Sequence, residues 1–338
     1  MTLWVIVIVT LAAAYFDQRV TNVLELAQHA QRNTQAAIDM ASTRAELLYR
    51  LGTTSMTEAG VGRGKTAVQL DNRLYRGLGE TTVRLQDGRG LVNLNLVDDD
   101  RLNRFLGQLG IVADQRGPMI DTLRDYTDED KLHRLNGAEE EDYLALKLPP
   151  PTNRKLSTPW EAMRIIGWRN RPELWANGTL VKLSSTGQAM GINPNTAPAE
   201  VLATIPGVTA DNTKLILARR QVTPFLRETD ISALTGWPLN LPMGMGVIPF
   251  PGDNVRMTQS APGLSWALQF NVTLTPSSLD APWQIDYFTR VSNPVNEPPQ
   301  LDGRVGSTPL SKLQVEVPEL PPRSDAPLEK LPAFLMPN

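Results

Sequence analysis

Cysteine is absent from the 338 residues of the chain, and histidine occurs only at His29 and His133. Without cysteine the chain has no disulfide, no thiol nucleophile and no cysteine-ligated zinc site. His29 falls in an apolar-periodic segment and His133 in an acidic one, and no serine nucleophile pattern accompanies either of them. Carboxylate pairs are numerous, but the sequence selects none of them as an acid and base pair. We therefore expect that the protein is not an enzyme.

An excess of positive charge is also missing. The formal net charge is -3 and the pI is about 5.6. These values exclude attraction of nucleic acid to the whole surface, so that only a local basic patch would serve such a role. Apolar residues make up 41% of the chain, which is enough to bury real cores. The length is sufficient for more than one domain.

Long hydrophobic runs are few, and the N-terminal one extends only from Leu3 to Phe16. A membrane-spanning helix needs about 20 apolar residues, so this shorter run is a signal-peptide core, a buried strand or part of a membrane helix. Only Met1 and Thr2 precede the run, so the basic flank that is typical of a signal peptide is missing.

The apolar pattern continues beyond this run as an amphipathic helix. From Asp17 to about Leu51, apolar residues recur at helical spacing and neither proline nor glycine interrupts them. We predict one helix over residues 1–52, which anchors the protein in a membrane through residues 3–16 and continues as a spine. The alternative is a buried core helix.

A glycine-rich segment follows this helix. Residues 59–66, AGVGRGKT, match a relaxed phosphate-binding loop. A true phosphate loop follows a buried strand, whereas the segment before this one is polar and ends a helix. We expect a flexible loop rather than a nucleotide site.

The remaining chain alternates between strand and helix patterns. Period-two runs and a turn signal at Asp87-Gly88 predict the first sheet strands within residues 53–97, with a hairpin tip at that turn. Helical spacing and caps dominate residues 98–256, and period two returns in residues 257–291. Residues 292–338 hold ten of the 27 prolines and indicate an extended tail that is disordered or wraps the surface. The predicted fold class is α+β, with a mostly α-helical domain inserted into a small antiparallel sheet.

One part of the helical block is similar to the helix-hairpin-helix of DNA receptors of the competence type. Its hairpin is Ile205-Pro206-Gly207-Val208, and such hairpins present backbone N–H groups to phosphates. Thr209 replaces the second hairpin glycine, which removes an easy close approach of the backbone. The cations available for phosphate are Lys214, Arg219, Arg220 and Arg227. A membrane-tethered DNA-binding receptor is therefore the alternative function, although the spacing of Asn93-x-Asn95 before it and Asn193-x-Asn195 within it favours a structural repeat.

Carboxylates are concentrated in residues 121–143, which hold nine of them and only three lysine or arginine side chains. Such crowding indicates either a solvated loop or a bound cation. The spacing is partly that of a calcium loop, but Leu132 and His133 occupy positions where an EF-hand needs a ligand and a glycine. The candidate hard-oxygen ligands for Ca²⁺ are Asp125, Asp128, Asp130 and Glu139.

Taken in order, these segments resemble the type II secretion minor pseudopilin K family, also called general secretion pathway protein K. The resemblance covers most of residues 3–290 and rests on the N-terminal helix and on a series of short motifs: Asp87-Gly88, Asn93-Leu94-Asn95, residues 125–130, Gly137-Ala138-Glu139, Asn153, Glu161, Gly167 and residues 193–197.

The resemblance implies a pilin-like spine on a small sheet with a helical insertion, and calcium in that insertion. It implies a structural subunit at the tip of the periplasmic pseudopilus, a single-pass protein of the bacterial inner membrane that helps to initiate and limit pseudopilus assembly beside minor pseudopilins I and J, without nucleic acid. The sequence departs from the family pattern in two respects. Tyr126 replaces a tryptophan, and the basic leader with its cleavage site is not present, which leaves a misplaced start, processing or truncation open. No acid precedes Asp17, in agreement with the family.

Overall fold

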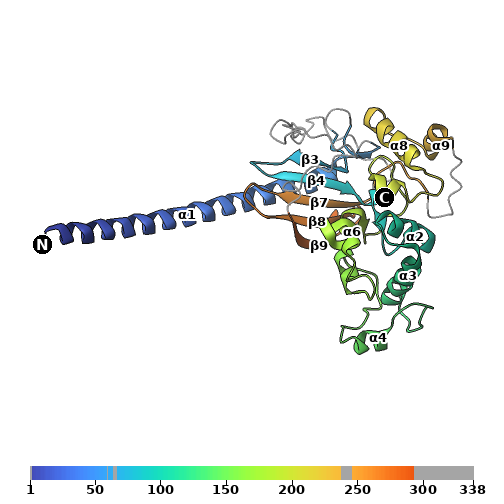
Figure 1. The fold of residues 1–338 in the computed structure, drawn as a ribbon. Coiled ribbons are helices and arrows are strands. Elements are labelled where there is room, and N and C mark those ends of the chain that lie inside the picture. The colour runs from blue at the N-terminus through green and yellow to red at the C-terminus, as the bar shows by residue number, and fades with distance from the viewer. Residues whose placement is uncertain (1, 59, 64–66, 237–245, 293–338) are drawn as a thin grey trace.

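A single long helix forms the N-terminal part of the protein. The structure is a computed structural model and describes residues 2–58, 60–63, 67–236 and 246–292. Helix α1 spans Thr2–Thr53, and its first half projects from the body of the molecule (Figure 1). Its buried side chains lie on one face, at helical spacing, and only in the last third of the helix: Met40, Thr43, Leu47, Leu48 and Leu51. The predicted spine helix is confirmed.

The last turns of α1 lie against a five-stranded antiparallel sheet. Its strand order is β3-β4-β7-β8-β9, with the bounds Asp71–Arg76, Thr82–Asp87, Asn254–Ser260, Trp266–Leu274 and Trp283–Ser292. One core fills the space between helix and sheet, and it includes Leu47 of α1, Leu85 of β4 and Phe270 of β8. The helix approaches the β3–β4 turn closely, where Thr43 Oγ1 accepts a hydrogen bond from Leu78 N at 2.9 Å. The pilin-like α+β fold class is confirmed.

The central strand β7 was not predicted, because the strand patterns after the helical block were recognised only in residues 264–275 and 283–291. It begins at Asn254, whereas the sequence placed the return to sheet at residue 257. β7 lies between β4 and β8, so strands on either side of the helical block are neighbours in the sheet (Figure 1). The prediction of a hairpin at Asp87-Gly88 was wrong, because Asp87 ends β4 and the partner of β4 on that side is β7.

The chain leaves the sheet at Asp87 and enters the inserted domain. A 3-10 turn, η2 (Gly88–Gly90), leads to the short strand β5 (Val92–Asn93), which pairs in parallel with β6 (Ser184–Ser185). The helical elements of the insert follow in the order α2 (Asp99–Gln108), α3 (Ala113–Thr127), α4 (Glu140–Ala145), η3 (Pro159–Arg164), α5 (Pro172–Trp175), η4 (Ala176–Gly178), α6 (Thr179–Leu183), α7 (Ala199–Leu202), α8 (Ala210–Val222) and α9 (Glu228–Thr235). They enclose a second core whose largest members are Phe105, Tyr126, Tyr143, Trp168 and Phe225.

Two sequence predictions fall on segments that the structure covers only in part. Strands β1 (Met56–Thr57) and β2 (Gly60–Val61) form a small antiparallel pair, and within the predicted glycine loop residues 59 and 64–66 lie outside the described residues. The predicted tail beyond Ser292 lies outside them as well.

Candidate functional site

A buried carboxylate joins the inserted domain to the sheet. Asp87 is fully buried at the end of β4, and its two oxygens accept four hydrogen bonds from three separate segments. Oδ1 accepts from Arg89 N at 3.1 Å and Gly252 N at 2.9 Å, and Oδ2 accepts from Asn193 Nδ2 at 2.8 Å and Thr196 Oγ1 at 2.9 Å. Burial raises the pKa of the Asp87 carboxyl, and these hydrogen bonds oppose that rise. The group therefore fixes where the chain leaves the sheet and where it returns.

A second buried polar contact holds the insert against the sheet. The guanidinium of Arg256 on β7 donates to the backbone carbonyl of Val181, within α6, and to that of Ser184 at 3.2 Å. Burial lowers the pKa of Arg256. Because a buried cation needs its donors satisfied, these carbonyls anchor α6 over the sheet face opposite α1.

The two asparagine pairs of the insert adopt the same local structure. Asn93 Oδ1 accepts from Asn95 N at 3.0 Å, and Asn193 Oδ1 accepts from Asn195 N at 3.0 Å. The second asparagine of each pair donates hydrogen bonds from its Nδ2 to two backbone carbonyls that are distant in the sequence. Asn95 donates to those of Leu156 and Thr186, and Asn195 donates to those of Phe225 and Pro249. Each pair then leads into a helix, α2 or α7. The spacing seen in the sequence therefore marks a repeated structural unit.

The acidic segment is not one loop. Asp125 lies on α3 and is fully buried, Asp128 caps the C-terminus of that helix, Asp130 is exposed in the turn beyond it, and Glu139 is 4% exposed at the start of α4. The four candidate ligands come from two helix ends and the turn between them, and they are close enough to repel one another electrostatically. The Gly137 backbone lies directly against the Asp125 carboxylate, and a Cβ atom at position 137 would overlap Asp125 Oδ2.

Several oxygens of this cluster are buried without a hydrogen-bond partner. They are Oδ1 of Asp128 and both side-chain oxygens of Glu139. Burial, followed by repulsion from Asp130 and Asp125, raises the pKa of Asp128. Burial, followed by repulsion from Asp125 and Asp128, raises the pKa of Glu139. Carboxylate oxygens that are desolvated, unpartnered and mutually repelling are the donors that a hard cation would satisfy.

The side chains of the neighbouring Lys131 and Arg134 form their ion pairs with other carboxylates. Lys131 Nζ pairs with Glu140 Oε2 at 3.0 Å, and the Arg134 guanidinium turns to Asp99 Oδ2 at 3.4 Å. Two backbone N–H groups donate to the cluster: that of Arg134 to Asp125 Oδ2 at 3.2 Å, and that of Leu132 to Asp130 Oδ1 at 2.8 Å.

Asn153 is an oxygen donor that the sequence analysis did not assign as a ligand. Its Oδ1 is buried without a partner, while its Nδ2 donates to the Asp130 carbonyl at 3.2 Å. It adopts a positive φ of 47°, a conformation that asparagine tolerates better than most residues. In the sequence Asn153 stood out only as one of the residues of the family resemblance. Among the described residues, no three Asp, Glu or His side chains already converge on one position that could hold an ion. The donor chemistry fits calcium, and a closed coordination shell is not formed.

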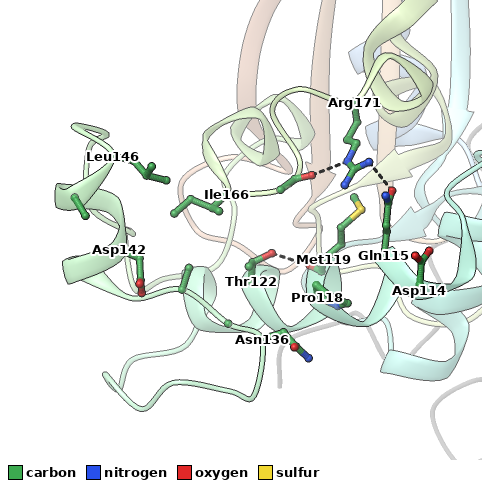
Figure 2. Close-up of a pocket in the computed structure, with 14 residues that line it drawn as sticks. Asp114, Gln115, Pro118, Met119, Thr122, Asn136, Asp142, Leu146, Ile166 and Arg171 are labelled. Carbon is green, nitrogen blue, oxygen red and sulfur yellow. Dashed lines mark hydrogen bonds between the residues drawn. The ribbon is translucent and has the colours of Figure 1, made fainter.

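A cavity of about 530 Å³ lies beside the acidic cluster, between α3, α4 and residues 166–171. Figure 2 shows its mixed wall. Met119, Pro118, Ile166 and Leu146 supply apolar surface, while Arg171 at one end bonds Gln115 Oε1 and the Gly167 carbonyl. Asn136, Gly137 and Asp142 belong to its lining, so the cavity shares a wall with the segment that carries Glu139.

Three of the four basic side chains that were candidates for phosphate contact interact with other residues of the chain. Arg220 Nη1 donates to the Pro194 carbonyl at 3.1 Å, and the Arg219 guanidinium lies 5.3 Å from the Phe225 ring centroid. Lys214 pairs with Asp211 at 3.0 Å. Thr209 is the N-cap of α8, where its side chain accepts from Asn212 N at 3.2 Å. The residue that departs from the DNA-binding pattern thus has a structural task, and so has Arg220.

The first half of α1 presents unburied apolar side chains. An 18-residue window of this helix has a mean hydropathy of 1.5 and is 0% buried, so by length and composition the helix can cross a membrane. A buried core helix, the alternative drawn from the sequence, does not describe this part of α1.

Comparison with known proteins identifies relatives of both sequence and fold. Residues 85–176, from β4 to η4, match the family model described as type II secretion system (T2SS), protein K. The fold is similar to a chain in the crystal structure of the GspK-GspI-GspJ complex from the type 2 secretion system of enterotoxigenic Escherichia coli. The TM-score is 0.53 at 14% sequence identity, and the match covers 79% of this chain and 99% of that chain. No curated protein matches the chain. The family match contains Asp87 and all four acidic candidates.

Proposed function

We propose that this chain is a minor pseudopilin of the type II secretion system protein K family and forms the tip of the periplasmic pseudopilus. Residues 3–16 would anchor it in the bacterial inner membrane, with the globular part in the periplasm. It would help to initiate and limit assembly of the pseudopilus for export of folded proteins.

The observation that carries this proposal is that the exposed apolar half of α1 and the inserted domain lie at opposite ends of the molecule. The bare apolar half of α1 extends to one side of the sheet, and the inserted domain lies at the other end (Figure 1). Helices of this kind pack beside similar helices in a membrane or a filament. The insert occupies the place above the sheet where a further subunit would add, so the chain fits the end of a filament better than its middle.

Minor pseudopilins I and J are the proposed partners, because a solved structure of similar fold is a GspK-GspI-GspJ complex. The test is co-purification of the full chain, in detergent, with full-length pseudopilins I and J from the same genome. A stable ternary complex is expected. Absence of a complex, together with retention of duplex DNA in low salt, would contradict the proposal and favour a DNA receptor. Arg219→Ala is the control, since it would weaken DNA binding but leave the complex intact.

Calcium is the proposed cofactor of the insert. Asp125, Asp128, Asp130 and Glu139 would hold the ion, with the unpartnered Asn153 Oδ1 as a further donor. The ion would neutralise the cluster and order residues 128–139 between α3 and α4, a stabilising role without catalytic chemistry. No reaction is assigned to the protein.

A further inference from the structure

The cavity beside the acidic cluster has walls that the fold holds in place. Trp168 Nε1 donates to the Met119 carbonyl at 2.8 Å, which fixes residues 166–171 against α3. Ile166 N donates to the Tyr143 hydroxyl at 3.2 Å, which fixes the same segment against α4. Ligand sites in proteins are usually preformed in this way, and the volume of about 530 Å³ lies within their usual range of about 300–1,000 Å³.

Much of the cavity surface is apolar, and part of it is exposed. Six apolar residues contribute to the lining: Pro118, Met119, Ala138, Ala145, Leu146 and Ile166. Met119 is buried, and a methionine adapts its shape to different apolar side chains. Ala145 and Leu146, at the C-terminal end of α4, are exposed, Leu146 by 59%. The cavity is therefore open along α4, so that a long ligand can enter it and continue over the surface.

Negative charge surrounds this apolar surface. Asp114 and Asp142 line the cavity. Asp121 Oδ2 accepts hydrogen bonds from Asn136, a further lining residue, at 3.2 Å from N and 3.0 Å from Nδ2. Among the described residues of the lining, Arg171 alone is cationic. Three carboxylates and one guanidinium give a net charge of -2 without the carboxylates of the acidic cluster, and such a concave site attracts cations.

The single cation of the lining serves the wall of the cavity. Arg171 Nε donates to the Gly167 carbonyl at 3.1 Å, and its Nη1 donates to Gln115 Oε1. These bonds hold the guanidinium at one end of the cavity (Figure 2). An anionic ligand would have to compete with these acceptors for the guanidinium and would meet an excess of carboxylates, so a cationic ligand fits better.

We infer that this cavity binds a polypeptide segment of a partner protein in which an apolar side chain adjoins a lysine or arginine. The apolar side chain enters between Met119 and Ile166, and the cation lies at the border, beside Asp142 or Asp114. Apolar anchors in a groove, with complementary charge at its border, are a recurring mode of peptide recognition. This inference depends neither on the proposed tip function nor on bound calcium.

Disulfide tethering of peptides to the full chain in detergent tests this site, because the chain has no cysteine of its own. Ala145→Cys places a thiol in the lining. Leu144→Cys, the matched control, places one at an exposed neighbouring position of α4 outside the lining. The probes are three cysteine-bearing peptides of equal length that contain leucine and lysine, leucine and glutamate, or serine and lysine. Under mild reducing conditions, the equilibrium yield of each mixed disulfide reports the affinity of its peptide.

The expected result is a preference that is confined to the cavity. In the Ala145→Cys chain, the leucine–lysine peptide should form about five times more mixed disulfide than either other peptide, and salt should reduce its advantage over the glutamate peptide. In the Leu144→Cys chain, the three yields should agree within about a factor of two. Equal yields in the Ala145→Cys chain, or a preference for glutamate there, would overturn the inference. The same preference in both chains would also overturn it, because the acidic surface as a whole would then attract the peptide.

Two further changes in the Ala145→Cys chain separate charge from shape. Asp114→Asn should reduce the preference for lysine over glutamate and leave the preference for leucine over serine unchanged. Leu146→Ser should have the opposite pair of effects, because it removes apolar contact and no charge. Asp280→Asn, at an exposed turn, is the control and should change neither preference. If Asp114→Asn and Leu146→Ser also change neither, the peptide binds outside the cavity and the inference fails.

Discussion

Asp87 and Asn193 are 106 residues apart in the chain, yet Asp87 Oδ2 accepts a hydrogen bond from Asn193 Nδ2 at 2.8 Å at the root of the inserted domain. The same carboxylate accepts from Gly252 N, where the chain comes back toward β7. One buried group thus ties together the departure of the chain from the sheet, the second asparagine pair and the return.

Asp87→Ala should strongly destabilise the protein. It leaves four donors without their acceptor, and buried donors of this kind cost about 1–3 kcal/mol each when they stay unpaired, less where water enters. We expect a loss of about 3–5 kcal/mol in the free energy of unfolding, measured by urea denaturation of the full chain in detergent. Asp280→Ala, at an exposed turn, is the control and should change stability by less than about 0.5 kcal/mol. Equal effects of the two changes would show that the network does not hold the insert.

The acidic cluster should make stability depend on pH. The folded pKa values of Asp128 and Glu139 are raised by burial and by neighbouring carboxylates, so the folded chain binds more protons than the unfolded chain above pH about 4. When a chelator keeps Ca²⁺ away, the free energy of unfolding should therefore fall as the pH rises above about 4. Glu139→Gln removes one of the titrating groups, and the fall should be smaller in that variant. A fall of the same size in both proteins, measured by thermal unfolding, would place the effect elsewhere.

Calcium should stabilise the protein through the unpartnered oxygens of Glu139. Saturating Ca²⁺ at 100 times its Kd would add about 2.7 kcal/mol to the free energy of unfolding. Glu139→Gln should remove most of this gain, because the amide loses the negative charge that a hard cation prefers. Glu141→Gln changes an exposed carboxylate of the same helix and should keep it. Thermal unfolding with Ca²⁺ and with chelator measures both, and an unchanged gain in Glu139→Gln would exclude this residue as a ligand.

The sequence predicted those elements whose signals are local. The spine helix, β8 and β9 follow from their periodicity, and the four acidic candidates lie close together along the chain, so their clustering could be expected. β4 and β7 pair across the whole inserted domain, and no local pattern marks such a partner. The hairpin expected at Asp87-Gly88 failed for this reason.

Two further features of the inserted domain, helix α3 and the position of Asn153, could not be predicted from the sequence. Gly117-Pro118 interrupts the helical pattern of α3, so this 15-residue helix was not predicted and its last turn was treated as an acidic loop. Asn153 approaches the cluster from a separate segment, and only the fold brings its oxygen there.

Two glycines near the acidic cluster should respond in opposite ways to the same substitution. At Gly137, an alanine Cβ would overlap Asp125 Oδ2, so Gly137→Ala must displace the buried carboxylate, at a cost of about 1–3 kcal/mol. At Gly117, inside α3, a Cβ would meet nothing within 4 Å, so Gly117→Ala should stabilise the protein by about 0.5–1 kcal/mol through helix propensity. Urea unfolding of the two variants decides the signs. If Ca²⁺ holds Asp125 in place, Gly137→Ala should also reduce the shift in Tm that Ca²⁺ produces, and Gly117→Ala should not. Stabilisation by Gly137→Ala would show that Asp125 is free to move away and that the cluster is not fixed by this contact.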